Sequence, residues 1–250
     1  MKALQVEHKG LVAWVWLNRP DRLNAINQIM LDELQDTFAS FSDNKSIRAI
    51  VLAGRGRAFS SGFDVNWLAE RTLEEIRSNR APIREVFETI ERCSQPVIAA
   101  VQGHAQGGGL IFVLVADFVL ASPTAQFGAP EVRIGIFPSL GLVPRLERTV
   151  GIRAAKRIVL TGDSINVQEA QHSGLIDRII TPEDRLLDET QVFAEKLAGL
   201  PVTAVQVTKA SFHVHHLPEF PEWETDKSAE AWAAPERLPA MQAFLNRKKT

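Results

Sequence analysis

The sequence predicts an α/β protein in which strands and helices alternate in layers, followed by a helical C-terminal region. Two observations lead to this prediction. An apolar run typical of a buried strand is twice followed by a glycine-containing turn and a helical pattern, in residues 49–92 and again in residues 96–116. Beyond residue 162 the periodicity becomes helical. Strands that alternate with helices at this spacing are typical of a layered α/β core.

The first third of the chain is expected to form a hairpin, a helix, a strand and a charged helical segment. Residues 4–8 and 11–17 alternate in polarity around Lys9 and Gly10, which predicts a hairpin whose outer residues face solvent. Residues 27–41 carry apolar side chains at helical spacing and are expected to cover the strand at 49–53. Residues 66–92 are helical, but Pro82 interrupts the pattern, so we expect two helices or one broken helix.

The rest of the chain begins with a second strand, turn and helix. Residues 96–101 predict a buried strand, the apolar run 110–116 a buried helix, and residues 117–121 a further strand. Helices are expected at 167–173 and 186–200, followed by a tail rich in tryptophan and proline. We therefore place the α/β core in residues 1–195 and a C-terminal helical region in residues 196–250.

Composition narrows the function classes. The chain has 250 residues, of which 45% are hydrophobic and 23% charged, and its net charge of -2 argues against a nucleic-acid partner, which would need a basic face. The longest apolar run is well short of the ~20 residues that span a bilayer, so we expect no membrane partner. The charged N-terminus lacks a signal segment, and the single cysteine, Cys93, cannot form an internal disulfide. We expect a cytoplasmic protein.

Two glycine-containing stretches are the most informative feature of the chain. They are residues 58–64 (AFSSGFD) and 103–109 (GHAQGGG), and each follows a strand-type run. Glycine lets the backbone turn sharply and approach a ligand, which exposes main-chain N–H groups near a helix start. Two such donors can hold one developing oxyanion. The pair therefore predicts the two halves of one oxyanion hole.

Two further stretches accompany them, residues 17–25 (LNRPDRLNA) and 130–138 (PEVRIGIFP). In order and spacing the four stretches resemble the enoyl-CoA hydratase/isomerase (crotonase) superfamily, from about Val6 to Arg247. The resemblance implies a spiral of ββα turns with a C-terminal trimerisation region, and hence a homotrimer or a dimer of trimers. A helical cap within one chain is the alternative. The resemblance also implies an acyl-CoA substrate, with coenzyme A as part of the substrate thioester and no separate cofactor.

The resemblance assigns three catalytic positions. The oxyanion donors would be the backbone N–H groups of Phe63 and Gly108, and the base would be Glu131, which Pro130 aims by fixing the turn. A thioester carbonyl acidifies its α-carbon only if the enolate oxygen is stabilised, and two preorganised donors in a dry pocket provide that stabilisation. An apolar pocket would raise the pKa of Glu131 toward neutrality, where a base works best.

A departure from the hydratase pattern points to the reaction. Family members that hydrate a double bond use a second glutamate, and that position is Ile111 here. A third position, which carries aspartate in dienoyl isomerases, is Ser139. One base suffices to remove an α-proton and return it at the γ-carbon, so the pattern resembles Δ3,Δ2-enoyl-CoA isomerases. The alternative is hydration of a 2-enoyl-CoA, with water positioned by Ser139 or by a carboxylate such as Glu85 or Glu88.

A different class of function stays open. A family member that has lost catalysis could bind acyl-CoA, a protein or RNA, although retention of Glu131 and of both glycine turns argues against it. The chain contains no tyrosine, which removes a phenol-assisted mechanism known in the family. His213, His215 and His216 invite a metal interpretation, but zinc needs three or four ligands and no other Cys or His cluster accompanies them, so we expect no metal.

The resemblance also implies the substrate contacts. Main chain near residues 22–25 and 61–65 would line the path of coenzyme A, and the segment 67–92 would form a lid over the acyl pocket. The C-terminal tail would bring an aromatic and a basic residue to the adenine and phosphates; a solvated basic terminus is the alternative. Asp64 is expected as a helix cap in the ligand loop and not as a base. The binding residues so assigned are Arg22, Leu23, Ala25, Ser61, Gly62, Asp64, Val65, Gly107, Ile111, Pro130, Ser139, Phe244 and Arg247.

Overall fold

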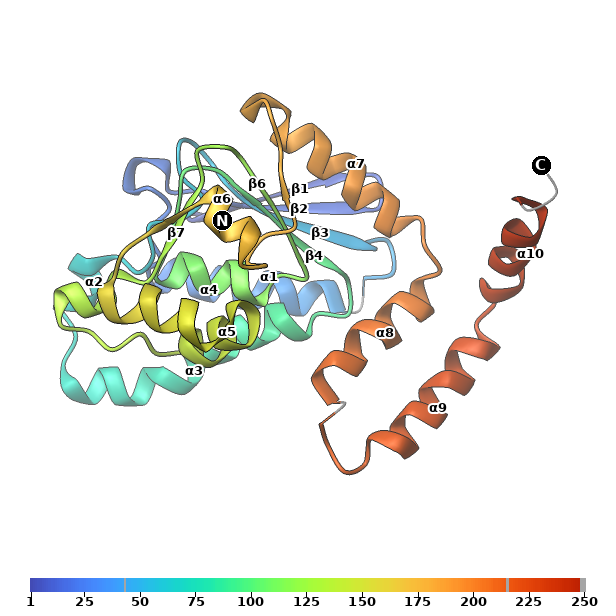
Figure 1. Ribbon diagram of the computed structural model, residues 1–250. Helices are drawn as coiled ribbons and strands as arrows, with labels where there is room; N and C mark the ends of the chain where they lie inside the picture. Colours follow the sequence, from blue (N-terminus) through green and yellow to red (C-terminus); the bar gives the residue numbers. More distant parts are fainter. Residues whose placement is uncertain (43, 215, 248–250) are drawn as a thin grey trace.

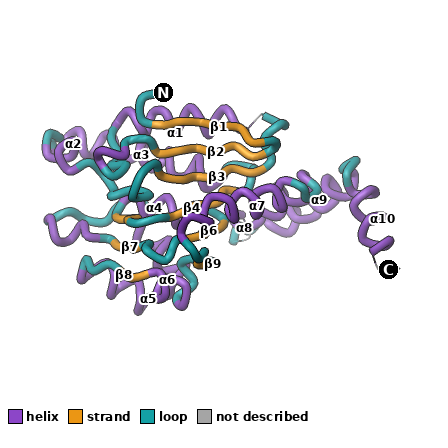
Figure 2. The backbone as a smooth tube through the Cα atoms, turned by 90° about the horizontal axis from the view of Figure 1, so that it is seen from above, coloured by secondary structure: helices purple, strands orange, loops and turns teal. Residues whose placement is uncertain are grey.

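The computed structural model describes residues 1–42, 44–214 and 216–247, and a six-stranded sheet organises this part of the chain (Figures 1 and 2). The strands lie in the order β1-β2-β3-β4-β6-β9, and all neighbours are parallel except the first pair. A smaller three-stranded sheet has the order β5-β7-β8. The strands are β1 (Leu4–Lys9), β2 (Val12–Leu17), β3 (Ala49–Gly54), β4 (Val97–Val101), β5 (His104–Gln106), β6 (Phe118–Ala121), β7 (Gln126–Gly128), β8 (Ile165–Asn166) and β9 (Arg178–Ile179).

The predicted N-terminal hairpin is present, but its second strand is buried on both faces. Leu4 pairs with Leu17 in the antiparallel register of β1 and β2. All residues of β2 are buried, so the expectation that the outer residues face solvent is wrong for this strand. The reason is a helix from late in the chain, α7 (Leu186–Ala198), which packs against the side of the sheet that carries Trp14 and Trp16.

Helices α1 (Gln28–Ser42) and α4 (Gly108–Val115) cover the opposite face of the sheet (Figure 1), and the apolar periodicity of residues 27–41 predicts this position for α1. Helix α1 buries Met30, Leu34 and Phe38 in the same core cluster as alternate residues of β2 and β3. Helix α4 is buried almost throughout, which explains why its sequence is apolar on all sides. The second glycine stretch runs directly into α4, and the first lies between β3 and the following helix.

The charged segment after β3 forms two helices, α2 (Val65–Ala69) and α3 (Leu73–Arg92). The break comes before Leu73 and not at Pro82, which lies inside α3. A capping box starts the second helix, because the Thr72 hydroxyl accepts from the Glu75 N–H and the Glu75 carboxylate accepts from the Thr72 N–H. Pro82 removes one helical hydrogen bond, but Ser78 and Pro82 are exposed, so the freed carbonyl faces water.

The part of the chain that follows α4 and β6 is mainly helical. The sequence did not predict α5 or the short strands β5, β7, β8 and β9. Three 3-10 helices interrupt the loops: η1 (Pro20–Arg22), η2 (Pro130–Ile134) and η3 (Glu183–Arg185). No helix in the described residues is long and apolar enough to cross a membrane. The later helices are α5 (Leu142–Thr161), α6 (Val167–His172), α8 (Val202–Val214), α9 (Phe220–Ala233) and α10 (Arg237–Arg247).

Helices α8, α9 and α10 extend away from the sheet to one side of the molecule (Figures 1 and 2). One buried ion pair joins α8 to the core. The Lys209 ammonium donates to the Gln95 carbonyl at 2.9 Å and to the Asp117 carboxylate at 2.6 Å, and the same carboxylate oxygen accepts from the Val97 N–H at 2.7 Å. This contact holds the base of the C-terminal helices at the start of β4 and β6. The division into residues 1–195 and 196–250 stays a prediction.

Candidate active site

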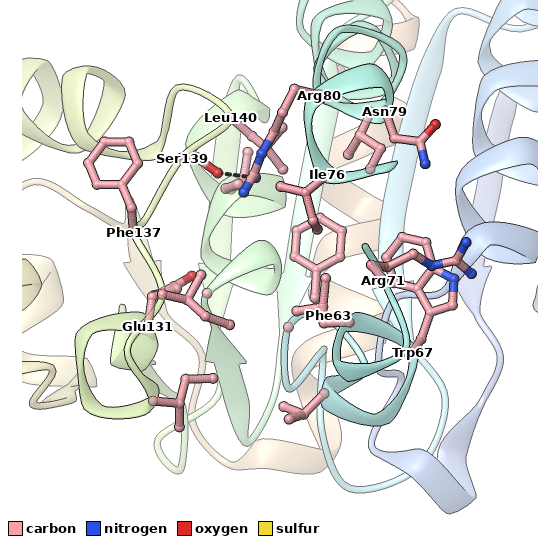
Figure 3. Close-up of a pocket in the computed structure, with 18 of the residues that line it drawn as sticks. Phe63, Trp67, Arg71, Ile76, Asn79, Arg80, Glu131, Phe137, Ser139 and Leu140 are labelled. Atoms are coloured by element: carbon pink, nitrogen blue, oxygen red, sulfur yellow. Dashed lines mark hydrogen bonds between the residues drawn. The ribbon is translucent and has the colours of Figure 1, made fainter. Parts of the chain in front are cut away.

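A cavity of about 400 Å³ lies between the α2–α3 segment and the stretch around η2 (Figure 3). Its walls are mainly apolar, with Phe63, Trp67 and Ile76 on the side of the two helices and Phe137 on the side of the η2 stretch. Many of the residues assigned from the sequence line this one cavity. They are Ser61, Gly62, Phe63, Val65, Gly107, Ile111, Pro130, Glu131 and Ser139.

The two glycine stretches lie against each other at the floor of this cavity. Ser60 and Ala105 form a parallel bridge, in which the Gln106 N–H donates to the Ser60 carbonyl at 3.0 Å. A Cβ atom on Gly62 would lie 2.6 Å from the Gln106 carbonyl oxygen and 3.3 Å from the Gly108 nitrogen. Gly62 also has a φ of +92°, which side chains rarely tolerate. Only glycine lets the first stretch come this close to the second.

The two amides assigned as oxyanion donors have no acceptor among the described residues. The Ile26 N–H donates to the Gly62 carbonyl at 2.8 Å, and the Asp64 N–H donates to the Ile26 carbonyl at 2.9 Å. This bridge leaves the intervening Phe63 N–H directed away from Ile26. The Gly108 N–H lies in the first turn of α4, where amides have no partner within the helix. Both amides are therefore available to a bound anion.

A buried hydrogen-bond network holds the first glycine stretch in place. The Ser60 hydroxyl donates to the Asn24 carbonyl at 2.9 Å and accepts from the Gly62 N–H at 3.2 Å. The Asn24 side-chain amide donates to the carbonyls of Arg55 and Ala58 at 2.9 and 2.8 Å. The 17–25 stretch thus supports the first glycine stretch, a role that was not predicted from the sequence.

Four of the described residues assigned to coenzyme A do not line the cavity. Asp64 ends the first glycine stretch, and Arg22, Leu23 and Ala25 lie beside that stretch. The Ser61 N–H donates to the Leu23 carbonyl at 2.9 Å, which places the 22–25 segment next to Ser61, a residue that lines the cavity. Asp64 caps α2, because its carboxylate accepts from the Asn66 N–H at 3.2 Å, and it pairs with Arg19. The roles of Arg22, Leu23 and Ala25 in binding stay predictions.

Glu131 is the second residue of η2, directly after Pro130, and its side chain reaches the second glycine stretch. A Cβ atom on Gly107 would lie 2.6 Å from Glu131 Oε1, so the carboxyl group lies against the bare Cα of that glycine. Glu131 Oε2 is buried and has no hydrogen-bond partner among the described residues. Burial raises the pKa of Glu131, and a hydrogen bond from its own backbone amide opposes this only in part. A carboxylate whose pKa is raised by burial is a stronger base than an exposed one.

The wall near Glu131 offers no second carboxylate at the family position. Ile111 is buried and lines the cavity one helical turn after Gly107, whose carbonyl accepts from the Ile111 N–H at 3.1 Å. Glu85 is exposed and Glu88 pairs with Arg92, and neither lines the cavity. The lid carboxylate that the sequence analysis considered is therefore at neither of these two positions.

The structure adds four polar cavity residues from the α2–α3 segment that were not predicted from the sequence: Arg71, Glu75, Asn79 and Arg80. The Glu75 carboxylate is engaged by the Thr72 N–H at 2.8 Å and by Arg71 at 3.0 Å. The hydrogen bond from the Thr72 backbone, followed by that from its hydroxyl, lowers the pKa of Glu75. Residues 76, 79, 80 and 83 share one face of α3, so helical spacing was the available signal.

Some assigned residues fall outside what the structure describes. Phe244 and Arg247 belong to α10, but their side chains lie outside the described part of the chain, and their contact with coenzyme A stays a prediction. His215 is also outside the described residues. Within those residues, no group of three His, Cys, Asp or Glu side chains is placed to hold a metal ion.

The spiral α/β fold, the paired glycine turns and the buried glutamate together define a class of enzyme. The chain belongs to the enoyl-CoA hydratase/isomerase family, whose sequence model matches residues 7–249. The family and the crotonase-type fold expected from the sequence are thereby confirmed, and the protein is an enzyme of the hydratase/isomerase type.

Individual relatives cover nearly the whole chain. A probable enoyl-CoA hydratase of Rhizobium meliloti is 35% identical, and the alignment covers 99% of this chain and 96% of the relative. The crotonyl-CoA hydratase of Syntrophomonas wolfei is 33% identical, with coverage of 98% and 95%. Among solved structures, an enoyl-CoA hydratase from Bacillus anthracis superposes with a TM-score of 0.92 at 30% identity, covering 98% of this chain and 96% of that structure.

Proposed function

We propose that this enzyme converts 3-enoyl-CoA thioesters into 2-enoyl-CoA thioesters, with Glu131 as the base that moves the proton. The observation that supports this reaction best is the Glu131 carboxyl group, whose Oε2 is buried without a hydrogen-bond partner among the described residues, in a mainly apolar cavity where Ile111 occupies the position of a second glutamate. A proton shift along the acyl chain needs one base and no water. Hydration needs a group that holds and activates a water molecule.

The reaction follows from the placement of three groups. The N–H groups of Phe63 and Gly108 donate to the thioester oxygen and stabilise the negative charge that develops there. Glu131 removes a proton from C2, and the C3–C4 double bond becomes part of a dienolate. The same carboxyl group returns the proton to C4, the C2–C3 double bond forms, and the carbonyl is restored. The raised pKa of Glu131 suits both steps, because the group must accept and then release the proton.

Hydration of 2-enoyl-CoA is the second candidate, and the names of the relatives favour it. A water molecule would need polar partners in the cavity, and Ser139 with Arg80 offers a hydroxyl and a guanidinium. Isomerisation is preferred because Ile111 occupies the position of the glutamate that would hold the water, and neither Glu85 nor Glu88 lines the cavity.

The test is to incubate the purified enzyme with 3-enoyl-CoA and, separately, 2-enoyl-CoA thioesters of several chain lengths in heavy-oxygen water. We expect mass spectrometry to show the 2-enoyl product without added mass. Addition of heavy water to 2-enoyl-CoA, without isomerisation, would overturn the proposal in favour of hydration. Neither product, with acyl-CoA binding intact, would favour a family member that binds without catalysis.

A pair of variants at Ile111 sharpens the choice. Ile111→Glu restores the second carboxylate and is expected to raise hydration of crotonyl-CoA relative to isomerisation. Ile111→Gln introduces a side chain of similar size without the charge and serves as the control. Equal hydration by the two folded variants would show that a carboxylate at this position does not determine the reaction.

The proposal extends to assembly and compartment. The enzyme would act in the cytoplasm as a homotrimer or a dimer of trimers, with coenzyme A entering only as part of the substrate. Helices α9 and α10 expose Trp232, Leu238 and Met241, and exposed apolar side chains of this size are typical of an interface. Light scattering coupled to size exclusion tests the assembly, and a monomer at micromolar concentration would contradict it.

A further inference from the structure

Arg80 places an uncompensated positive charge in the acyl cavity. Its side chain descends from α3 and its Nη1 donates to the Ser139 hydroxyl across the cavity (Figure 3). A guanidinium has five N–H donors, and Ser139 uses one of them. No carboxylate among the described residues lies within ion-pair distance of Arg80. Burial, together with the like charge of Arg84, lowers the pKa of Arg80, but an arginine stays protonated at neutral pH.

The neighbouring charges do not balance Arg80. Arg71, the other arginine at the cavity, is paired with Glu75 and lies over the Trp67 ring, with its guanidinium carbon 5.0 Å from the ring centre. The pKa of Glu131 is raised by burial, whereas an ion pair with Arg80 would lower it. Arg80 is half-buried and is thus the arginine at the cavity that has no ion-pair partner among the described residues, so a bound carboxylate would find an available counter-charge there.

Arg80 lies where the acyl chain of the substrate would extend, away from the carbons that react beside Glu131. In Figure 3, Arg80 and Ser139 lie together at one end of the view, apart from Glu131 and Phe63. Apolar side chains such as Ile76 and Leu140 line the cavity as well and suit a methylene chain. A saturated hydrocarbon end next to Arg80 would leave most of the guanidinium N–H groups without an acceptor.

We propose that Arg80 determines specificity by binding a carboxylate at the far end of the acyl chain, so that the preferred substrates are enoyl-CoA thioesters of dicarboxylic acids. The inference rests on the proposed function to the extent that the cavity must hold an acyl chain beside Glu131. A guanidinium binds a carboxylate through two parallel hydrogen bonds, and the other guanidinium at the cavity, that of Arg71, is already paired with Glu75. The Ser139 hydroxyl can donate a third hydrogen bond to the same carboxylate.

The test is calorimetric binding of saturated thioesters, which cannot undergo the reaction. Glutaryl-, adipyl- and suberyl-CoA are compared with pentanoyl-, hexanoyl- and octanoyl-CoA, which match them in chain length. We expect the dicarboxylic member of at least one pair to bind about tenfold more tightly or better. Arg80→Met should abolish this preference without weakening the monocarboxylic thioester, and Arg80→Lys should retain part of it. Arg77→Met, an exposed position on the same helix outside the cavity, is the matched control.

Three outcomes would overturn the inference. They are equal affinity within every pair, an unchanged preference in a folded Arg80→Met variant, or an equal loss of affinity for free coenzyme A in that variant. The last result would assign the guanidinium to the coenzyme moiety. Because these ligands do not react, the preference is measured independently of isomerisation. A preference without isomerase activity refutes only the proposed function, and isomerisation without a preference refutes only the role of Arg80.

Discussion

Gly107 allows a quantitative test of how closely Glu131 must be held. The residue has φ +51° and ψ -115°, a conformation that suits glycine. Because glycine has no Cβ, the Glu131 carboxyl group can lie directly against the Cα of Gly107. In a Gly107→Ala variant the new Cβ would lie 2.6 Å from Glu131 Oε1, where an ordinary contact begins at 3.4 Å. The carboxylate oxygen must therefore move by about 0.8 Å.

The size of the effect follows from this displacement. A shift of about 1 Å in a catalytic group costs roughly 100-fold in rate, so we expect kcat to fall by about that factor, equivalent to ~2.7 kcal/mol in the activation free energy. Backbone strain at the new alanine should lower the free energy of unfolding by about 1–3 kcal/mol. The affinity for saturated acyl-CoA serves as the check on the oxyanion site, because Gly107 directly precedes the Gly108 N–H: a loss of kcat without a loss of affinity assigns the effect to Glu131.

Gly135→Ala is the matched control for this experiment. Gly135 also lines the cavity and has a positive φ of +72°, but a Cβ atom there would meet nothing within 4 Å. Strain of roughly 1–2 kcal/mol is expected without loss of kcat. The assay is kcat and KM for 3-enoyl-CoA together with thermal unfolding. A folded Gly107→Ala enzyme with kcat within about threefold of the unchanged enzyme would refute the reasoning, as would an equal loss of kcat in both variants.

Three further predictions concern Glu131 and Lys209. Glu131→Gln should lower kcat by about 10²–10⁴-fold with acyl-CoA affinity retained, and full turnover in the variant would remove this residue from the mechanism. Because burial raises the pKa of Glu131, kcat/KM should fall as the pH drops through that raised pKa. The folded state also binds this proton more tightly than the unfolded state does. The free energy of unfolding should therefore decline as the pH rises from the ordinary glutamate pKa of about 4.3 through the raised pKa. Urea titrations of the unchanged enzyme and of Glu131→Gln at several pH values should show a weaker dependence of the free energy of unfolding on pH in the variant. An identical dependence in the two proteins would contradict this prediction. Lys209→Met should lower the free energy of unfolding by about 1–3 kcal/mol, less than for a fully buried pair because Asp117 is 26% exposed, and an unchanged urea midpoint would contradict this.

Local patterns predicted much of the order of strands and helices, but they did not predict which helix packs on which face of the sheet. Alternation in residues 11–17 identified β2, but the helix that covers its second face, α7, comes late in the chain. No local pattern tells a strand which distant helix will pack on it. Pro82 illustrates the opposite case, since a proline that would break an isolated helix is accommodated where α3 is exposed.

The candidate site also contains some residues that could be located from the sequence and others that could not. The glycine stretches and Glu131 could be located because backbone approach and a turn fixed by proline leave marks in the sequence. Arg80 and Glu75 could not be separated from Glu85 and Glu88 by composition, since all four are charged residues of one helix. Their difference lies in which face of α3 meets the cavity, and that depends on how α3 packs against the rest of the protein.

The close approach of Gly62 to Gln106 and Gly108 also has a consequence for the order in which the enzyme gains activity during folding. The two glycine stretches are distant in sequence, so the anion site forms only after β3, β4 and β5 have found their places. Contacts of long sequence separation form slowly compared with helices. A refolding chain should therefore show its helical signal before it shows turnover, which makes activity a more stringent measure of completed folding than secondary structure.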